Sequence, residues 1–251
     1  MTPAGPRDHS ARGPGHWPAP SRPGTGAAGN CKDRLVNPWQ AAPFRRILGD
    51  AERECIRHRL SELRWAARLL VLPPGVARFQ LRARRLAWRS QDYLSLMSAT
   101  RPGDLRTLLT LAPPAARVVE LGTATGWTAI SLALASPQRR VITYDIAARP
   151  EPERYLELVD PSVRRRVEIV TAPGAAGPRD DQPVDMLYID SSHEREQTVA
   201  EVLAWRPVLR RGASVVFDDY RHPSYPGVSE AIAELGLSGD QRGTLFVHRV
   251  P

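Results

Sequence analysis

Three aspartates and a histidine stand where two short apolar runs of the chain end. The run "DMLYID" (185–190) closes on Asp190, with His193 three residues later, and "ASVVFD" (213–218) closes on Asp218, followed by Asp219. Carboxylates gathered at one place repel one another unless something neutralises them, and a hard divalent cation takes oxygen ligands of this kind. We therefore predict that Asp190, Asp218 and Asp219 bind a hard divalent cation. Each acid alone has another interpretation, since it could satisfy backbone amides or cap a helix.

His193 and Asp190 together could move a proton. An imidazole beside a carboxylate titrates near neutral pH and is a common general base. We predict that Asp190 and His193 are the catalytic residues. The alternative for His193 is a surface histidine at the start of a helix.

A turn of small residues follows another apolar run, "RVVEL" (117–121). Its two glycines are spaced G-x-x-x-G, which differs from the G-x-G-x-x-G spacing of dinucleotide-binding turns. Small residues let a ligand approach the backbone closely, and the start of the following helix favours a carboxylate, so an amino-acid moiety suits this place. Glu120 is expected to face a turn amide or the ammonium group of the ligand. The predicted ligand-binding residues of this segment are Glu120, Gly122, Thr123, Ala124, Gly126 and Thr128.

Asp145 ends the next apolar run, "RVITYD" (140–145), 23 residues after Gly122. A carboxylate at this position of an α/β sheet commonly binds both hydroxyls of a ribose. The turn and Asp145 together indicate a ligand with a ribose at one end. A helix cap or a solvated strand end is the alternative for Asp145.

The elements that must position these residues alternate strictly between strand and helix from Arg117 onward. Such alternation predicts an α/β fold with a Rossmann-like, mostly parallel, doubly wound sheet and helices on both faces, because parallel strands need crossover connections. The acids and the turn then meet at the carboxyl ends of the strands, where ligands of such sheets bind. The predicted strands are 117–121, 140–145, 167–171, 185–190, 213–218 and 244–250, and the predicted helices lie near 126–136, 152–159, 193–206 and 227–235.

The chain before this sheet divides into two regions of different composition. Residues 1–48 are rich in Pro, Gly and Arg without apolar periodicity, which predicts a disordered tail. Residues 49–112 are predicted to form basic helices that act as a lid or a dimerisation element, and residues 113–251 form the main domain. One helical segment is expected over 76–98, and Asp104 is expected to cap a short helix that follows.

The charge of the chain is concentrated in its first part. Residues 1–110 carry 19 Lys and Arg against 8 Asp and Glu, whereas residues 111–251 carry 16 against 19. The basic part could dock on an anionic partner. Its preference for arginine over lysine also fits a GC-rich coding bias.

No apolar run is long enough for a membrane span or a signal peptide, which predicts a cytoplasmic protein. The isolated Cys31 and Cys55 argue against a disulfide framework.

Four stretches of the chain together resemble class I S-adenosylmethionine-dependent methyltransferases, and within them the cation-dependent O-methyltransferase-like branch. They are "VVELGTATGWTAISLA", "ITYDI", "VDMLYIDSSHEREQTVAEVLAWRPVLRRGASVVFDDY" and "PGVSEAI", within residues 100–251. The resemblance implies that Glu120 and the turn surround the methionine part of S-adenosylmethionine and that Asp145 holds its ribose. It also implies that Asp190, Asp218 and Asp219 match a magnesium site with His193 beside it.

The chain departs from the pattern of this branch in three places. Ser191 and Ser192 replace a glycine-containing turn, Ala124 replaces a frequent glycine, and the end of the chain is short for the usual antiparallel hairpin.

The function implied by the resemblance is the cation-assisted O-methylation of a small hydroxylated metabolite, such as a phenol, a sugar or a natural product. One alternative is an RNA methyltransferase that uses the basic helices, although no RNA-binding module is recognisable. A nicotinamide-dependent oxidoreductase fits less well because of the glycine spacing, and the intact acids argue against a non-catalytic binding protein. The expected partners are the small acceptor and a second copy of the chain bound through the N-terminal helices.

Overall fold

The computed structural model describes residues 65, 67–114 and 116–251. The chain divides into two units, Met1–His58 and Arg59–Pro251, and all described residues belong to the second. The predicted tail and the first part of the predicted helical region, with both cysteines, lie outside the described residues. No described helix has the length and apolar character that crossing a membrane requires.

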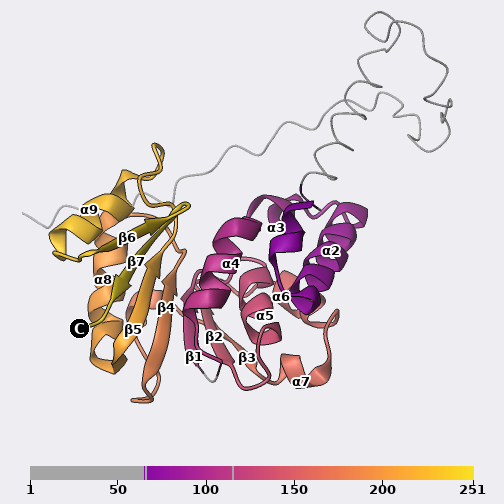
Figure 1. Cartoon of the computed structure of the whole chain (residues 1–251), viewed down its shortest axis with the longest axis horizontal. Coiled ribbons are helices and arrows are strands. Elements are labelled where there is room, and N and C mark those ends of the chain that lie inside the picture. Colours follow the sequence, from indigo (N-terminus) through magenta and orange to yellow (C-terminus); the bar gives the residue numbers. More distant parts are fainter. Residues whose placement is uncertain (1–64, 66, 115) are drawn as a thin grey trace, which may run out of the picture. The chain divides into compact units, whose positions relative to one another are not determined.

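A seven-stranded sheet forms the centre of the second unit (Figure 1). Its strand order is β3-β2-β1-β4-β5-β7-β6, with the first five strands parallel and the last two antiparallel to their neighbours. This confirms the predicted Rossmann-like fold. The strands are β1 (Arg117–Leu121), β2 (Arg140–Asp145), β3 (Val167–Thr171), β4 (Val184–Ile189), β5 (Leu209–Phe217), β6 (Gly239–Arg242) and β7 (Leu245–Arg249).

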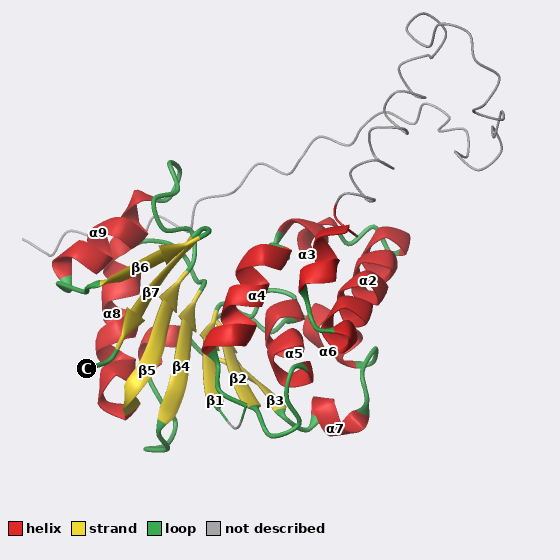
Figure 2. Cartoon of the chain, in the orientation of Figure 1, coloured by secondary structure: helices red, strands yellow, loops and turns green. Residues whose placement is uncertain are grey.

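Helices cover both faces of the sheet, because successive strand residues point to opposite faces. Val118 and Met186 pack in one core with Leu105 and Leu132, whereas the adjacent residue Val119 packs in another core with helix residues further along the chain. Figure 2 shows α8 and α9 on one side of the strands and α4 and α5 on the other. The helices are η1 (Leu69–Val71), α2 (Pro74–Arg89), α3 (Tyr93–Met97), α4 (Pro102–Leu111), α5 (Trp127–Leu134), α6 (Glu151–Leu156), α7 (Pro161–Arg164), η2 (Gly174–Ala176), α8 (Arg195–Trp205), η3 (Arg206–Val208) and α9 (Pro226–Glu234).

Helix α2 packs against α5 and shares its apolar core. Phe79 and Ala83 of α2 are buried in one cluster with Trp127 and Ile130 of α5. The Gln80 amide Nε2 also donates a hydrogen bond of 2.9 Å to the Ser131 hydroxyl inside this contact. The described part of the basic helical region is thus held by buried contacts to the helices of the sheet domain.

The segment expected as one helix over 76–98 is divided into α2 and α3. Gln91 adopts a positive φ of 56°, which ends the first helix, and the Asp92 carboxylate accepts a 3.0 Å hydrogen bond from the Ser95 amide at the start of the second. The prediction that Asp104 caps the following helix was wrong, because α4 begins at Pro102 and no side chain caps it. The Asp104 carboxylate instead accepts a hydrogen bond of 3.1 Å from the Thr244 hydroxyl, which ties α4 to the residue before β7.

The end of the chain forms an antiparallel hairpin, contrary to the expectation that it is too short for one. Strands β6 and β7 pair from Gly239 opposite His248 to Arg242 opposite Leu245. The four residues of β6 are all exposed and, apart from Gly239, polar, so they lack the apolar alternation by which a strand is recognised in sequence.

Candidate functional site

Backbone hydrogen bonds hold the carboxyl ends of four parallel strands together at one edge of the sheet. The Asp190 amide donates to the Leu121 carbonyl over 2.8 Å, and the Asp218 amide donates to the Ile189 carbonyl over 3.0 Å. The Thr123 amide donates to the Tyr144 carbonyl over 3.0 Å. The predicted turn and the predicted acids therefore lie at neighbouring strand ends.

Gly122 makes the turn possible because it packs directly on the end of β4. Its φ is +106°, and a Cβ atom there would lie 2.0 Å from the carbonyl oxygen of Asp190. Gly126 has a φ of +79° and is the N-cap residue of α5, a helix with no acidic residue in its first turn. Both positions therefore require glycine, one for its backbone angle and the close approach and the other for its backbone angle.

Asp145 faces the turn from the end of β2. One of its carboxylate oxygens accepts a 2.9 Å hydrogen bond from the Ala124 amide, and the other accepts a 3.2 Å hydrogen bond from the Ala147 amide. The Arg149 guanidinium lies 3.9 Å away. In this structure Asp145 thus stabilises the backbone of the turn and of the segment after β2.

Glu120 is a buried acid that forms a different hydrogen bond from the one expected. Its carboxylate accepts from the Thr143 hydroxyl on β2, rather than from a turn amide. Burial raises the pKa of Glu120 to about 8. The Thr143 hydroxyl is also 2.8 Å from that of Thr123, so these polar side chains form one buried group beneath the turn.

Thr128 lies at the start of α5, as predicted, but its hydroxyl already has a partner. It is 2.7 Å from the hydroxyl of Thr100, which lies between α3 and α4. The link between those two helices is therefore held next to the start of α5.

The three aspartates and His193 come together at the ends of β4 and β5. The imidazole Nε2 of His193 is 3.4 Å from a carboxylate oxygen of Asp190 and 3.6 Å from one of Asp219. Strand β5 ends at Phe217 and Asp219 adopts a φ of 49°, so the chain has left the strand before the second of the paired acids. The structure brings together all four residues that the sequence placed at this edge.

Tyr188 is a further member of this cluster that the sequence did not reveal. Its side chain is fully buried, and its hydroxyl is 3.1 Å from a carboxylate oxygen of Asp190 and 3.2 Å from one of Asp218. The other oxygen of Asp218 is 3.1 Å from the Thr244 hydroxyl. In the sequence Tyr188 lies within an apolar run, where a tyrosine is typical of a buried strand.

The electrostatics of the cluster favour uptake of positive charge. The pKa of Asp218 is raised to about 7, mainly by burial and next by the charge of the neighbouring Asp190 carboxylate. Burial also raises the pKa of Asp190. The pKa of His193 is lowered by burial but raised more by Asp190, Asp219 and Asp218, so the net shift is upward.

The predicted metal centre is suitable in its chemistry but is not preformed. Carboxylate oxygens are the ligands that Mg²⁺ prefers. Within residues 65, 67–114 and 116–251, however, no three His, Cys, Asp or Glu side chains are arranged to hold a metal ion. The physical reason is that the Tyr188 hydroxyl lies between Asp190 and Asp218, while the His193 imidazole lies between Asp190 and Asp219.

Comparison with known proteins identifies the region that builds this edge. Residues 119–220 match a family model described as a methyltransferase domain. The match begins in β1 and ends at Tyr220, directly after the paired acids, so it includes the turn, Asp145 and the whole acid cluster. No curated protein sequence matches the chain.

Solved structures that are similar to this chain include cofactor-bound Rv0187 from MTB, at 22% identity and a TM-score of 0.49 over 65% of this chain and 89% of that one. The O-methyltransferase TomG from Streptomyces achromogenes is 21% identical, with a TM-score of 0.48 over 71% and 91% of the two chains. A putative rRNA-methylase from Clostridium thermocellum is 14% identical, with a TM-score of 0.48 over 59% and 94%. Each TM-score lies below 0.5, so the fold is assigned from the strand order and not from these likenesses.

Proposed function

We propose that this protein is an S-adenosylmethionine-dependent methyltransferase that acts on a hydroxyl group of a small molecule. The observation that carries the proposal is that the residues matching the methyltransferase domain model are those that build the turn, Asp145 and the acid cluster at one sheet edge. Bound S-adenosylmethionine would supply the methyl group of its sulfonium. The acceptor oxygen would bond to the methyl carbon in line with the carbon–sulfur bond, which breaks, and the sulfonium would leave as a neutral thioether.

The turn and its neighbours would bind the cofactor. The turn at Gly122 to Gly126 and the start of α5 suit the methionine part, because a helix start without acidic residues favours a carboxylate. Asp145 would accept hydrogen bonds from the ribose hydroxyls with the lone pairs that its bonds to the Ala124 and Ala147 amides leave free. Glu120, Thr123 and Thr128 would act mainly by supporting the turn, since their side chains already have partners in the protein.

His193 would take the proton that the acceptor hydroxyl loses as its oxygen bonds to the methyl group. Its Nε2 is buried between the Asp190 and Asp219 carboxylates, so this nitrogen would carry a proton toward them and the other ring nitrogen, Nδ1, would accept the proton of the acceptor. The two flanking carboxylates would stabilise the imidazolium once the proton is transferred. Asp190 is the nearer of the two and also orients the ring.

A divalent cation remains part of the proposal, with Asp190, Asp218 and Asp219 as its ligands. When bound, it would lower the pKa of the acceptor hydroxyl and fix its position. The grouping of these carboxylates supports this assignment, because Asp190 and Asp218 both contact the buried Tyr188 hydroxyl and Asp190 and Asp219 both lie beside His193, so that one cation could reach all three acids after a small rearrangement.

The test is S-adenosylmethionine binding by titration calorimetry with Asp145→Ala. We expect the parent to bind and the variant to lose about 1.5–3 kcal/mol, the contribution of hydrogen bonds to a charged group. Asp181→Ala is the matched control, because Asp181 is exposed and outside the site. Thermal unfolding of both variants separates a binding defect from a folding defect. Tight binding of a nicotinamide dinucleotide without S-adenosylmethionine binding would contradict the proposal.

A second candidate is an RNA methyltransferase, which one surface feature favours. Arg78, Arg82, Arg85 and Arg89 are all exposed and lie at helical spacing along one face of α2. Such a stripe suits a chain of phosphates. RNA binding that weakens steeply with salt, and is lost when the four arginines become glutamine, would favour this candidate.

The helices before the sheet domain are proposed to cover the site or to join two copies of the chain. Three side chains of α3 support this, because Tyr93, Leu94 and Met97 are exposed by 57%, 43% and 86%. Exposed apolar side chains on one short helix are typical of a surface that is covered in the working protein.

A further inference from the structure

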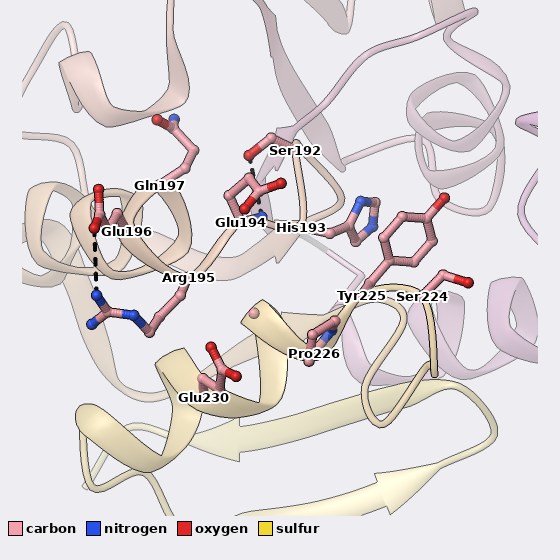
Figure 3. A pocket seen from close by; sticks show the side chains of 11 residues that line it. Ser192, His193, Glu194, Arg195, Glu196, Gln197, Ser224, Tyr225, Pro226 and Glu230 are labelled. Atoms are coloured by element: carbon pink, nitrogen blue, oxygen red, sulfur yellow. Dashed lines mark hydrogen bonds and ion pairs between the residues drawn. The ribbon is translucent and has the colours of Figure 1, made fainter.

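A cavity of about 660 Å³ opens beside the acid cluster, where the segments after β4 and β5 meet. Its walls come from the start of α8 on one side and from the start of α9 with the segment before it on the other (Figure 3). The lining residues include Ser192, His193, Glu194, Ser224, Tyr225 and Glu230. His193 belongs to both this cavity and the acid cluster, so a ligand in the cavity would contact the candidate base.

The wall next to His193 is formed by an aromatic stack. The rings of His193 and Tyr225 lie 4.8 Å apart at 27°, and Tyr225 makes an equivalent contact with His222. Figure 3 shows the rings of His193 and Tyr225 facing each other at one end of the lining. A molecule in contact with Tyr225 would therefore be separated from the candidate base His193 by no more than the Tyr225 ring.

The backbone that carries this wall is tightly packed. A Cβ atom at Gly227, in the first turn of α9, would lie 2.5 Å from the Arg195 amide nitrogen and 2.6 Å from the His193 carbonyl oxygen. His193 itself adopts a φ of 61°. The start of α9 and the residues before α8 are thus in close backbone contact where they line the cavity.

The charge of the lining is negative. Three glutamates line the cavity, Glu194, Glu196 and Glu230, together with one arginine, Arg195. Ion pairs occupy that arginine with Glu234 and with Glu196, while no hydrogen bond or ion pair in the described residues reaches the carboxylates of Glu194 or Glu230. The carboxylates of Glu194 and Glu230 therefore have no direct partner among the described residues, although the charge of Glu230 also acts on Arg195, and the net negative lining would repel a phosphate or a carboxylate.

We propose that this cavity receives the methyl acceptor and that the acceptor is a hydroxylated amine, with its ammonium group held by Glu194 and Glu230 and its hydroxyl directed at His193. The inference rests on the proposed methyltransferase function and adds the chemical class of the substrate. The serine hydroxyls of the lining supply further hydrogen-bond partners for a polar molecule of this kind.

The experiment compares matched pairs of probes that differ only in charge. Transfer of a labelled methyl group from S-adenosylmethionine is measured for glucosamine, tyramine and dopamine, each against its neutral N-acetyl derivative. Saturation-transfer NMR measures binding of the same six compounds without S-adenosylmethionine. The proteins are the parent, the double variant Glu194→Gln/Glu230→Gln, and the control Glu157→Gln/Asp240→Asn, which removes two exposed carboxylates elsewhere.

We expect kcat/KM and binding to favour an amine over its N-acetyl partner by about two- to fivefold, the effect of one exposed ion pair. The preference should vanish in Glu194→Gln/Glu230→Gln and persist in the control, with S-adenosylmethionine binding unchanged in both. Equal treatment of charged and neutral probes by the parent, or a preference that survives in the double variant, would overturn the inference. The same holds if no amine is bound or methylated.

The two proposals fail in distinguishable ways. If S-adenosylmethionine does not bind, the proposed function fails, and the NMR measurement alone decides whether the cavity prefers ammonium groups. If S-adenosylmethionine binds and only neutral compounds are methylated, the function stands and the assignment of the cavity to an amine is wrong.

Discussion

One phenol and one imidazole face the three carboxylates at the ends of β4 and β5. The Tyr188 hydroxyl contacts Asp190 and Asp218, and His193 lies between Asp190 and Asp219. A single phenol can donate only one hydrogen bond at a time, so it cannot satisfy both carboxylates. The cluster therefore retains a deficit of positive charge, which a cation would remove.

At the residue scale, we predict that a chelator abolishes methyl transfer and that Mg²⁺ restores it, while S-adenosylmethionine binding is unchanged. Asp219→Ala should lower turnover at least about tenfold, because the ion then loses a ligand and the acceptor its orientation. Steady-state kinetics and calorimetry measure the two effects, with Asp181→Asn as the control. Full activity in the chelator, with Asp219→Ala equal to the parent, would remove the cation and leave His193 as the sole base.

Most of the candidate site could be predicted from the sequence because its residues follow the strands directly. Asp190, Asp218 and Asp145 each end an apolar run, and parallel strands bring such ends to one edge. Tyr188 could not be found in this way, since its polar atom is at the end of a ring that packs like any core residue. The hydrogen bond of Glu120 to Thr143 was also hidden, because it depends on the register of β1 against β2.

At the element scale, the short helix α3 depends on Asp92. Its carboxylate accepts hydrogen bonds from the Ser95 amide and hydroxyl and from the Tyr155 hydroxyl, at 3.0, 2.7 and 2.7 Å. Burial raises the pKa of Asp92, but these bonds and the Arg154 charge lower it more, and the net shift is downward. The acid thereby joins α3 to α6.

We predict that the stabilisation which Asp92 provides at neutral pH is lost in acid. A carboxyl whose pKa is lowered on folding stabilises the native state above its unfolded pKa of about 4, and this stabilisation is lost as the pH falls through the lower folded value. Asp92→Asn should cost about 0.5–2 kcal/mol at neutral pH and flatten the acid limb of the stability curve. Urea unfolding from pH 3 to 7 measures both. An acid limb identical to that of the parent would contradict the prediction.

Elements with apolar periodicity were predictable, and those without it were not. Strands β1, β2, β4 and β5 and helices α5, α8 and α9 lie close to their predicted ranges, because each buries several side chains in the cores on the two faces of the sheet. Strand β6 has no buried residue and is held only by pairing with β7. The break between α2 and α3 comes from a positive φ at Gln91, a residue type that does not indicate a helix end.

At the scale of the whole molecule, the helices before the sheet are not a removable accessory. Deleting residues 1–48 should leave methyl transfer nearly intact. Deleting residues 1–95 should abolish it and lower the melting temperature, since loss of α2 exposes Trp127 and Ile130 to water. Activity assays and calorimetry of both truncations check this. A fully active protein that starts after residue 95 would contradict it.

The contact of Gly122 with the Asp190 carbonyl restricts how this protein can be re-engineered. Because a methyl group at residue 122 would come within 2.0 Å of that oxygen, any side chain introduced there displaces the end of β4 and the acid that follows it. A substitution made in the turn to change the proposed cofactor site would thus also move Asp190, the nearer carboxylate partner of His193. Asp145 contacts the turn through the Ala124 amide rather than through the end of β4, so a substitution at residue 145 would leave the packing of Gly122 on Asp190 in place.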